Sequence, residues 1–508
     1  MSEHLTIYPI IVHLLTAILL LLSWMNPKVQ RYISIIGSIV GIIVGGLLFS
    51  QVWTEGIQSV QLGNWKAPFG ITMVADTFAV TLIVLTNIVA LAVSIISTRN
   101  MVSSRLKFGY YAIFHFLIMG LSGAFITGDL FSLYVWFEVI IISSFVLLTI
   151  GGRNIQIEGA VKYFTLNMLS SIIFLTGIAM VYGVTGSLNM AELSRIIPEI
   201  ENQGLVHTIS LIFFIGFGVK SGVFPLYFWL PASYHTPPAA VSALFAGLLT
   251  KVGIYAMIRV FTLIFPLGEI NQMILMVVAG FTIFFGGIGA LVQKDIQRIF
   301  SYLIICHIGF MVGGLSLFTE VAIVGAVMYM FHDIIVKATL FLIGGVMYRI
   351  FGSTRLYDMG GLMDNYPRLS FLFAIPMFAL VGVPPLSGFW PKVSLFMASY
   401  TQGEMFLLIM FIFASLITLV IIAKIWNSTF SKKPVEREKR KAFKYFEKFS
   451  FAEKAAYIVP IIILVGVTLY YSFFAEHFQV ISERIGKELM NTEHYYNAVF
   501  GIKEETKL

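Results

Sequence analysis

Six ionisable side chains lie deep within apolar stretches of the 508-residue sequence. They are Glu138, Lys220, Lys251, His332, Lys337 and Lys392. A charge at the centre of a membrane-spanning helix costs about 2.5–3.5 kcal/mol on insertion scales, so these groups must face a protein interior, pair or become neutral. A glutamate beside a lysine keeps both groups charged, whereas separating the two in apolar surroundings favours their neutral forms. Such groups pass protons through intervening water. We therefore predict a proton path through these six residues, with no cofactor.

Each of these residues also has a structural alternative. A single lysine can snorkel to the membrane surface or donate to a backbone carbonyl. Glu138 can serve only as an ion-pair partner of Lys220, and His332 can be a hydrogen-bonded core residue. Lys251 fits the structural alternative least well, because it lies in the middle of a long apolar run.

The remaining polar groups near the apolar stretches are assigned structural roles. Asp76 and Asp129 begin apolar stretches and are expected to be helix N-caps. Arg259 and Lys424 lie near the ends of apolar stretches and are expected to snorkel. Four further residues are expected to be ordinary core residues without a role in the proton path: His13, His115, His235 and Cys306.

The composition indicates a membrane protein. Hydrophobic residues make up 58% of the chain and charged residues only 12%, whereas a soluble domain has about 25% charged residues. A single cysteine excludes an internal disulfide framework, and no His/Cys pattern indicates a metal or iron–sulfur site.

Apolar windows predict an all-α polytopic membrane protein with about fourteen transmembrane helices. The expected spans are 5–24, 32–53, 72–97, 109–127, 130–150, 158–184, 206–232, 238–263, 271–293, 297–318, 320–349, 369–400, 404–430 and 455–475. They divide the chain into three N-terminal helices (1–108), two five-helix repeats (109–263 and 271–430), a basic loop (431–454), and a last helix with a tail (455–508). Short amphipathic surface helices are expected at 190–201 and 476–490.

Basic residues alternate between successive loops. One set of loops contains Lys28, Arg105, Arg153, Arg298 and Arg355, and the dense basic segment 431–448 belongs to the same set. The intervening loops are mostly acidic. The positive-inside rule then places the basic loops in the cytoplasm and both termini outside a cell membrane. The net charge of +7 is explained by this topology, and nucleic acid is not an expected partner.

Two similar phrases fall in the two spans that proline interrupts. SGVFP occupies 221–225 and SGFWP occupies 387–391, and each has a lysine nearby. Five spans separate them, so the second copy must be inverted relative to the first. Inverted repeats with a discontinuous helix at matching positions are typical of transporters. Pro225, Pro384, Pro385 and Pro391 are predicted to break the helices, leaving carbonyls that water or a lysine can satisfy.

Longer motifs resemble a known family. They are WFE at 136–138, GVKSGVFPLYFWLPASY at 218–234, SALFAGLLTKVGIY at 242–255, KATLFLIGG at 337–345 and PPLSGFWPK at 384–392. They resemble the antiporter-like membrane subunits shared by respiratory complex I, membrane-bound hydrogenases and Mrp multisubunit sodium/proton antiporters. The resemblance covers nearly the whole chain, and within the family it favours the Mrp type.

The resemblance implies a fold of fourteen helices with two inverted five-helix repeats. It also implies that the six buried residues form the central proton path, and that the partners are other subunits of a hetero-oligomeric complex. One spacing departs from the family pattern: His332 and Lys337 are five residues apart, which puts them on different faces of a regular helix. Either a π-bulge realigns them or one of them leaves the path.

Three functions follow as alternatives. The leading one is a proton-translocating subunit of a multisubunit sodium/proton antiporter, a transporter rather than an enzyme. The second is a proton-pumping subunit of a complex I-type quinone oxidoreductase or a membrane-bound hydrogenase. The third, an inert assembly scaffold, is disfavoured by the buried charges. No oxygen-rich cluster predicts a sodium site, so protons are the expected ion here.

Overall fold

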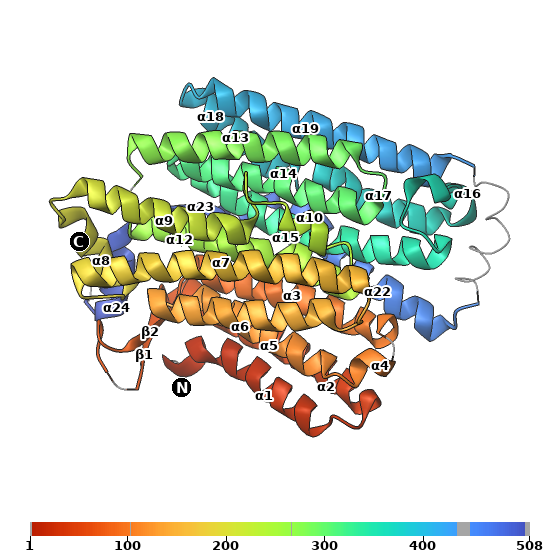
Figure 1. Cartoon of the computed structure of the whole chain (residues 1–508), viewed down its shortest axis with the longest axis horizontal. Coiled ribbons are helices and arrows are strands. Elements are labelled where there is room, and N and C mark those ends of the chain that lie inside the picture. The colour runs from red at the N-terminus through yellow and green to blue at the C-terminus, as the bar shows by residue number, and fades with distance from the viewer. Residues whose placement is uncertain (1–2, 64, 102, 266, 434–447, 503–508) are drawn as a thin grey trace.

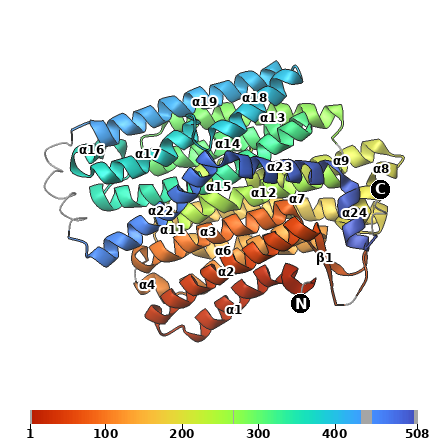
Figure 2. The same cartoon turned by 180° about the vertical axis from the view of Figure 1, so that it is seen from behind.

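The structure is a computed structural model that describes residues 3–63, 65–101, 103–265, 267–433 and 448–502. Most of the long helices run side by side along the longest axis of the molecule (Figures 1 and 2). The chain is therefore a helical bundle, as the composition predicts.

The N-terminal part contains an unexpected hairpin as well as helices. Its elements are η1 (Glu3–Ile7), α1 (Tyr8–Leu22), α2 (Pro27–Glu55), β1 (Gln58–Leu62), β2 (Ile71–Ala75), α3 (Thr77–Asn100) and α4 (Ser103–Leu106). The expected span at 72–97 begins too early, because residues 71–75 pair antiparallel with β1. Helix α3 starts only after Asp76, whose carboxylate accepts from the amide of Ala79 at 2.9 Å.

The first predicted repeat contains the first discontinuous helix. Its elements are α5 (Tyr110–Ile126), α6 (Leu130–Thr149), α7 (Asn154–Thr185), α8 (Met190–Glu199), α9 (Gln203–Ser221), α10 (Trp229–Ser233), α11 (Ala239–Leu244), the π-helical segment η2 (Phe245–Leu249) and α12 (Thr250–Leu263). The expected span 206–232 corresponds to α9, a break and α10.

The second predicted repeat has the same plan. Its elements are α13 (Glu269–Val292), α14 (Ile296–Leu317), α15 (Glu320–Phe351), η3 (Leu356–Asp358), α16 (Leu362–Asn365), α17 (Pro367–Val381), α18 (Phe389–Thr401), α19 (Met405–Trp426) and the π-helical segment η4 (Asn427–Ser431). The expected span 369–400 corresponds to α17, a break and α18.

Among the described residues, three helices follow the second repeat: α22 (Phe451–Phe473), α23 (Ala475–Met490) and α24 (Thr492–Phe500). The two amphipathic helices predicted at 190–201 and 476–490 are present as α8 and α23. Both bury one face, through residues such as Ile197 and Ile485. Most of the predicted loop 431–448 lies outside the described residues.

Twelve helices in the described part of the chain are long and apolar enough to cross a membrane. Two shorter apolar helices, Tyr110–Ile126 and Pro367–Val381, occupy the remaining two expected windows. A polytopic helical membrane protein is thus confirmed, while the count of fourteen spans stays a prediction.

The two helix breaks share one backbone arrangement. Helix α9 ends at Gly222 (φ 78°) and α17 at Gly382 (φ 87°), both left-handed. At each break the valine after the glycine also donates its amide to the helix, Val223 to Gly218 and Val383 to Phe378. The equivalent residues are therefore Gly222 and Gly382, 160 positions apart. Pairing SGVFP with SGFWP, 166 positions apart, puts the repeat out of register.

The two discontinuous helices enter the bundle from opposite ends. Helix α9 begins next to α8 at the left of Figure 1, whereas α17 follows α16 at the right, and Figure 2 agrees. The inverted relation that five intervening spans predict is therefore present in the fold.

Basic side chains gather at one end of the bundle. The N-terminus and α24 lie toward one end, while α4 and α16 lie toward the other (Figures 1 and 2). The basic residues of four predicted same-side loops line one common cavity, which includes Arg105, Arg153, Arg298 and Arg355. These loops therefore meet at one end of the molecule.

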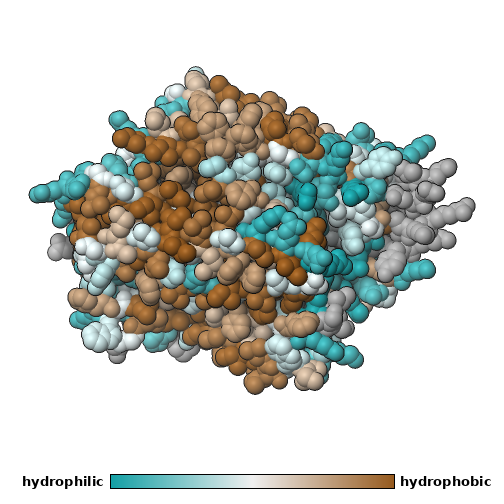
Figure 3. Space-filling view, in the orientation of Figure 1, coloured by the Kyte–Doolittle hydropathy of each residue, from teal (hydrophilic) through white to brown (hydrophobic). Residues whose placement is uncertain are grey.

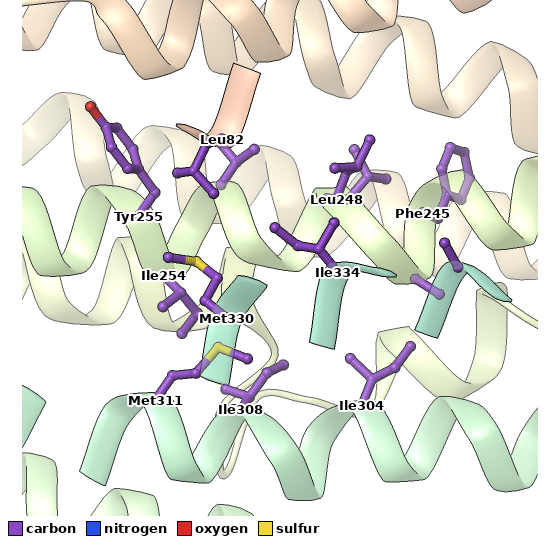
Figure 4. Packing of buried hydrophobic residues seen from close by; sticks show 14 of the residues in the cluster. Leu82, Phe245, Leu248, Ile254, Tyr255, Ile304, Ile308, Met311, Met330 and Ile334 are labelled. Carbon is purple, nitrogen blue, oxygen red and sulfur yellow. The ribbon is translucent and has the colours of Figure 1, made fainter. Parts of the chain in front are cut away.

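Apolar side chains cover the outside of the bundle and also fill its centre. Figure 3 shows apolar surface over much of the visible face between the two ends. Figure 4 shows the interior packing between α3, η2, α12, α14 and α15, with Leu82, Phe245, Leu248, Ile254, Tyr255, Ile304, Ile308, Met311, Met330 and Ile334 labelled. Three of the candidate residues, Lys251 of α12 and His332 and Lys337 of α15, lie on these same central helices and are therefore surrounded by apolar side chains.

Gly382→Ala is expected to destabilise the second break. A side chain at φ 87° costs about 1–2 kcal/mol, and a Cβ would also come within 3.0 Å of the Lys392 side chain. The thermal unfolding midpoint of the purified complex should fall. Gly46→Ala is the control, because this helical glycine has open space around it; equal midpoints for the two variants would contradict the assignment of the break.

Candidate functional site

The centre of the site is an ion pair between the two repeats. Lys251 Nζ of α12 lies 2.6 Å from Asp333 Oδ2 of α15, and both side chains are fully buried. Lys251 belongs to the first repeat and Asp333 to the second. The pair therefore bridges the two repeats in the interior of the bundle.

The π-helical segment η2 places a second acceptor beside Lys251. Lys251 Nζ donates to the carbonyl oxygen of Ala246 at 2.9 Å, and Ala246 lies within η2 (Phe245–Leu249). π-bulges interrupt the regular hydrogen-bond ladder and occur frequently at functional sites. The ammonium of Lys251 thus has both a carboxylate and a backbone carbonyl as partners.

Asp333 also faces two further basic groups. Its Oδ1 lies 3.9 Å from Lys337 Nζ and 3.5 Å from His307 Nδ1. The other ring nitrogen of His307, Nε2, lies 3.1 Å from Thr418 Oγ1 of α19. One buried carboxylate therefore lies within 4 Å of basic nitrogens of two lysines and a histidine.

The structure tests one of the two alternatives for the spacing of His332 and Lys337, the π-bulge. Helix α15 is a continuous α-helix through this region, so no π-bulge aligns the two residues. Asp333 and Lys337, four residues apart, share one face, while His332 Nδ1 lies 2.8 Å from Ser387 Oγ at the second break. His332 therefore contacts the break instead of the carboxylate cluster.

Lys392 satisfies the broken end of α17. Its ammonium donates to the carbonyl oxygens of Val381 at 2.6 Å and Leu380 at 3.2 Å. It also lies 5.6 Å from the ring centre of Phe310. The expectation that a lysine supplies the donors missing at a helix break is confirmed at this position.

Lys220 has a different partner from the one expected. Its Nζ donates to Ser171 Oγ of α7 at 2.9 Å and lies 4.7 Å from the ring centre of Phe137. Among the described residues it forms no ion pair. Glu138 is partly exposed, and its Oε1 has no hydrogen-bond partner in the described part of the chain. The predicted Glu138–Lys220 pair is therefore not formed in this structure.

A small cavity adjoins Lys220. Its volume is about 20 Å³, and its lining includes Asn167, Lys220, Leu249 and Gly253. About one water molecule fits such a volume. Because Leu249 and Gly253 flank Lys251 in sequence, the cavity lies between the helices that contain the two lysines.

The four predicted break residues divide into two groups. Pro225, Pro384 and Pro385 lie in the non-helical breaks, as expected. Pro391 is instead the third residue of α18, where a missing amide donor costs nothing because the first turn of a helix has no internal acceptor for it. The expectation that Pro391 breaks the second helix is wrong.

Several structural assignments can be compared with their contacts. Asp129 caps α6, as expected, by accepting from the amide of Ser132 at 2.8 Å. Arg259 does not snorkel: it is 4% exposed and forms a buried ion pair with Asp76. Lys424 donates to the carbonyls of Leu291 and Gln293 at the end of α13.

The remaining predicted core residues are buried or partly buried. His13 and His115 are stacked, with their Nδ1 atoms 3.1 Å apart, and Cys306 is buried. His235 accepts from Arg298 Nε at 3.2 Å near the basic end. Within the described ranges, no group of three or more His, Cys, Asp and Glu side chains has metal-binding geometry.

Two residues of the cluster are not in the predicted path, namely Asp333 and His307. The four-residue spacing between Asp333 and Lys337 is a signal that could have identified the first, because such residues share a helix face. No comparable signal exists for His307, whose neighbours Asp333 and Thr418 are distant in sequence.

This geometry defines a class: a polytopic membrane protein in which two inverted repeats are joined by a buried charged cluster. Residues 127–418 match the family described as NADH:quinone oxidoreductase/Mrp antiporter, transmembrane. The match extends over more than half of the chain, and the chain belongs to this family.

Individual relatives support the same conclusion. The D subunit of the Na(+)/H(+) antiporter of Alkalihalophilus pseudofirmus is 40% identical over 498 residues, covering 98% of this chain and 99% of that protein. Its counterpart in Bacillus subtilis is 39% identical over 494 residues, covering 97% and 98%. A chain in the solved Mrp complex from Dietzia sp. DQ12-45-1b superposes with a TM-score of 0.90 at 25% identity, covering 98% and 99%. The resemblance of the motifs to Mrp-type subunits is therefore confirmed, and the first two of these relatives are D subunits.

Asp333→Asn is expected to lower the stability of the assembled complex and to abolish ion exchange. Removing one partner of a buried ion pair costs about 3–5 kcal/mol, because it leaves the other charge uncompensated. Thermal unfolding of the purified complex and antiport in everted vesicles measure the two effects.

A matched double variant separates the two effects. Asp333→Asn combined with Lys251→Met removes both charges, so it should recover most of the lost stability without recovering transport. If the double variant is no more stable than Asp333→Asn alone, the ion pair does not set the stability of this region.

Proposed function

We propose that this chain is the proton-translocating membrane subunit of a multisubunit sodium/proton antiporter. The names of its relatives and the Mrp complex structure support the antiporter and its hetero-oligomeric partners. The proton path runs from Glu138 and Lys220 through Lys251, Asp333 and Lys337 to the second break, where Lys392 and His332 lie. The chain acts as a transporter and performs no redox or hydrolytic chemistry.

The observation that carries the proposal is that the central cluster contains more basic groups than carboxylates. Asp333 is fully buried with two lysines within 4 Å, at 2.6 Å and 3.9 Å. A buried carboxylate compensates one ammonium, and a second uncompensated charge in the same interior costs several kcal/mol. Protonating one lysine therefore favours proton loss from the other, which is the elementary step of a relay.

The first repeat supplies the entry to this cluster. Lys220 is bonded to a neutral hydroxyl, Ser171, and the adjoining cavity of about 20 Å³ has room for about one water molecule. A proton on Lys220 can then pass through that water toward Lys251 on α12. Rotation of Lys220 toward Glu138 gives the second, ion-paired state of the cycle.

The second repeat supplies the other end of the path. Lys392 donates to the two terminal carbonyls of α17, and His332 contacts Ser387 in the same break. Polar backbone at membrane depth is tolerated where it borders a cavity or is bonded within the protein. On this basis we assign the exit step to the second break.

Protons fit this path better than sodium does. Hard cations bind several oxygen ligands, whereas this path consists of four lysines and one histidine with two carboxylates, Glu138 and Asp333, that lie on different helices. Sodium then crosses through another subunit of the complex. The basic end of the bundle faces the cytoplasm, with both termini outside the cell membrane, as the positive-inside rule requires.

Glu138→Ala is expected to abolish antiport while leaving assembly of the complex unchanged. The variant removes the carboxylate that holds Lys220 in its ion-paired state. Glu138→Asp should retain part of the activity, because the charge remains with a shorter reach. Collapse of the pH gradient on sodium addition is the measurement, and wild-type exchange in the alanine variant would remove Glu138 from the path.

Lys220→Arg is expected to assemble normally and to lose most antiport. Arginine retains its proton at any accessible pH, so the variant can pair with Glu138 but cannot pass a proton on. A structural ion pair would tolerate this substitution, whereas a relay would not. Exchange near the wild-type rate would show that Lys220 is structural.

A further inference from the structure

A large basic cavity lies at the end of the bundle that contains α4 and α16. Its volume is about 1250 Å³. Six cationic side chains line it, contributed by α4, the start of α7, the α13–α14 connection, the start of α14, the end of α15 and the α15–η3 connection: Arg105, Arg153, Lys294, Arg298, Arg349 and Arg355. The proton path uses none of them.

The cavity has a strong excess of positive charge. The only acidic side chains in its described lining are Asp295 and Asp358, so six cations face two carboxylates. Both carboxylates already have partners. Asp295 accepts from the amides of Gln297 and Arg298 at 3.0 Å each, and Asp358 accepts from Ser353 at 2.6 Å.

The six cations lack anionic partners in the described part of the chain, where none of them forms an ion pair. Burial together with repulsion from Arg153 and Arg349 lowers the pKa of Arg105. In the described part of the chain, the side chain of Arg298 donates to the ring of His235. Such a cluster of like charges is stabilised by an anion, and guanidinium groups bind phosphate through paired hydrogen bonds.

Apolar side chains border the same cavity. Ile155 is 51% exposed, Val292 69% and Tyr357 73%, and all three belong to the lining. Inorganic phosphate cannot make apolar contacts with these side chains, whereas a phospholipid has acyl chains next to its phosphate that can. The cavity also lies where the spanning helices end, which is the depth of lipid headgroups.

We propose that this cavity binds the phosphate headgroup of an anionic phospholipid, with acyl chains against the apolar border. Basic pockets between transmembrane helices on the cytoplasmic side are suited to such headgroups. The bound lipid joins the start of α7, the α13–α14 connection and the end of α15, and so braces helices of both repeats. This inference does not depend on the proposed proton path.

Thermal unfolding of the purified, delipidated complex tests the proposal. Three probes are titrated separately: short-chain phosphatidylglycerol, short-chain phosphatidylcholine and inorganic phosphate. A ligand that binds the folded state raises the unfolding midpoint. We expect a saturable rise with phosphatidylglycerol and little change with the other two.

Two charge-matched variants locate the effect. The cavity variant combines Arg153→Gln, Lys294→Gln and Arg355→Gln, three exposed positions. The control variant combines Lys28→Gln, Lys107→Gln and Lys433→Gln, three exposed lysines outside the lining. The cavity variant should bind phosphatidylglycerol about a hundredfold more weakly, while the control variant behaves as the wild type.

Four results would overturn the proposal. Equal shifts with phosphatidylcholine would mean that the headgroup charge is not recognised. A full shift with inorganic phosphate would identify a free anion as the ligand, and equal losses in both variants would indicate general surface charge. No shift in the assembled complex would show that a neighbouring subunit covers the cavity.

Discussion

The ion pair between Lys251 and Asp333 is the constraint around which the interior is organised. Each ion that leaves water for a protein interior costs several kcal/mol, and only close partners repay it. The partners here belong to different repeats, so the pair can form only when α12 and α15 are correctly placed. The pair therefore links the protonation of the site to the packing of the two halves.

Close helix packing makes this contact possible. A Cβ at Gly247 in η2 would come within 3.1 Å of the carbonyl oxygen of Ile334, and one at Gly253 within 3.0 Å of the amide of Ser221. Small residues at such positions let backbones approach closely within a membrane. The glycines thus bring Lys251 near α15 on one side and near the first break on the other.

Much of the fold could be predicted from the sequence, because apolar windows and loop charges report directly on membrane spans. The hairpin formed by Gln58–Leu62 and Ile71–Ala75 could not, since a buried apolar strand and the start of an apolar helix have the same composition. The register of the repeat is not evident from the sequence letters either. The shared letters SG and P were more conspicuous than the shared backbone at Gly222 and Gly382.

The site was predictable in part for a related reason. Lysines within apolar runs are conspicuous, so Lys220, Lys251, Lys337 and Lys392 could be identified individually. The partners of Lys251, Lys220 and Lys392 could not, because Asp333, Ser171 and the carbonyls of α17 reach these lysines only through tertiary packing. Only the contact of Asp333 with Lys337 lies within one helix and can be read from the spacing. The buried pair of Arg259 with Asp76 also forms only through tertiary packing. In the sequence, both residues lie near the ends of apolar stretches, a position that is typical of snorkelling side chains and helix caps.

The corrected register of the repeats also means that the two halves are alike in backbone but not in chemistry. Lys220 lies two residues before its glycine, where the second repeat has Leu380, and Lys392 lies ten residues after its glycine, where the first repeat has Ala232. A scaffold that was symmetric in both respects would present one energy profile to an ion arriving from either face. Here the lysine precedes one break and follows the other, so the profile seen from one face is not the mirror image of the profile seen from the other.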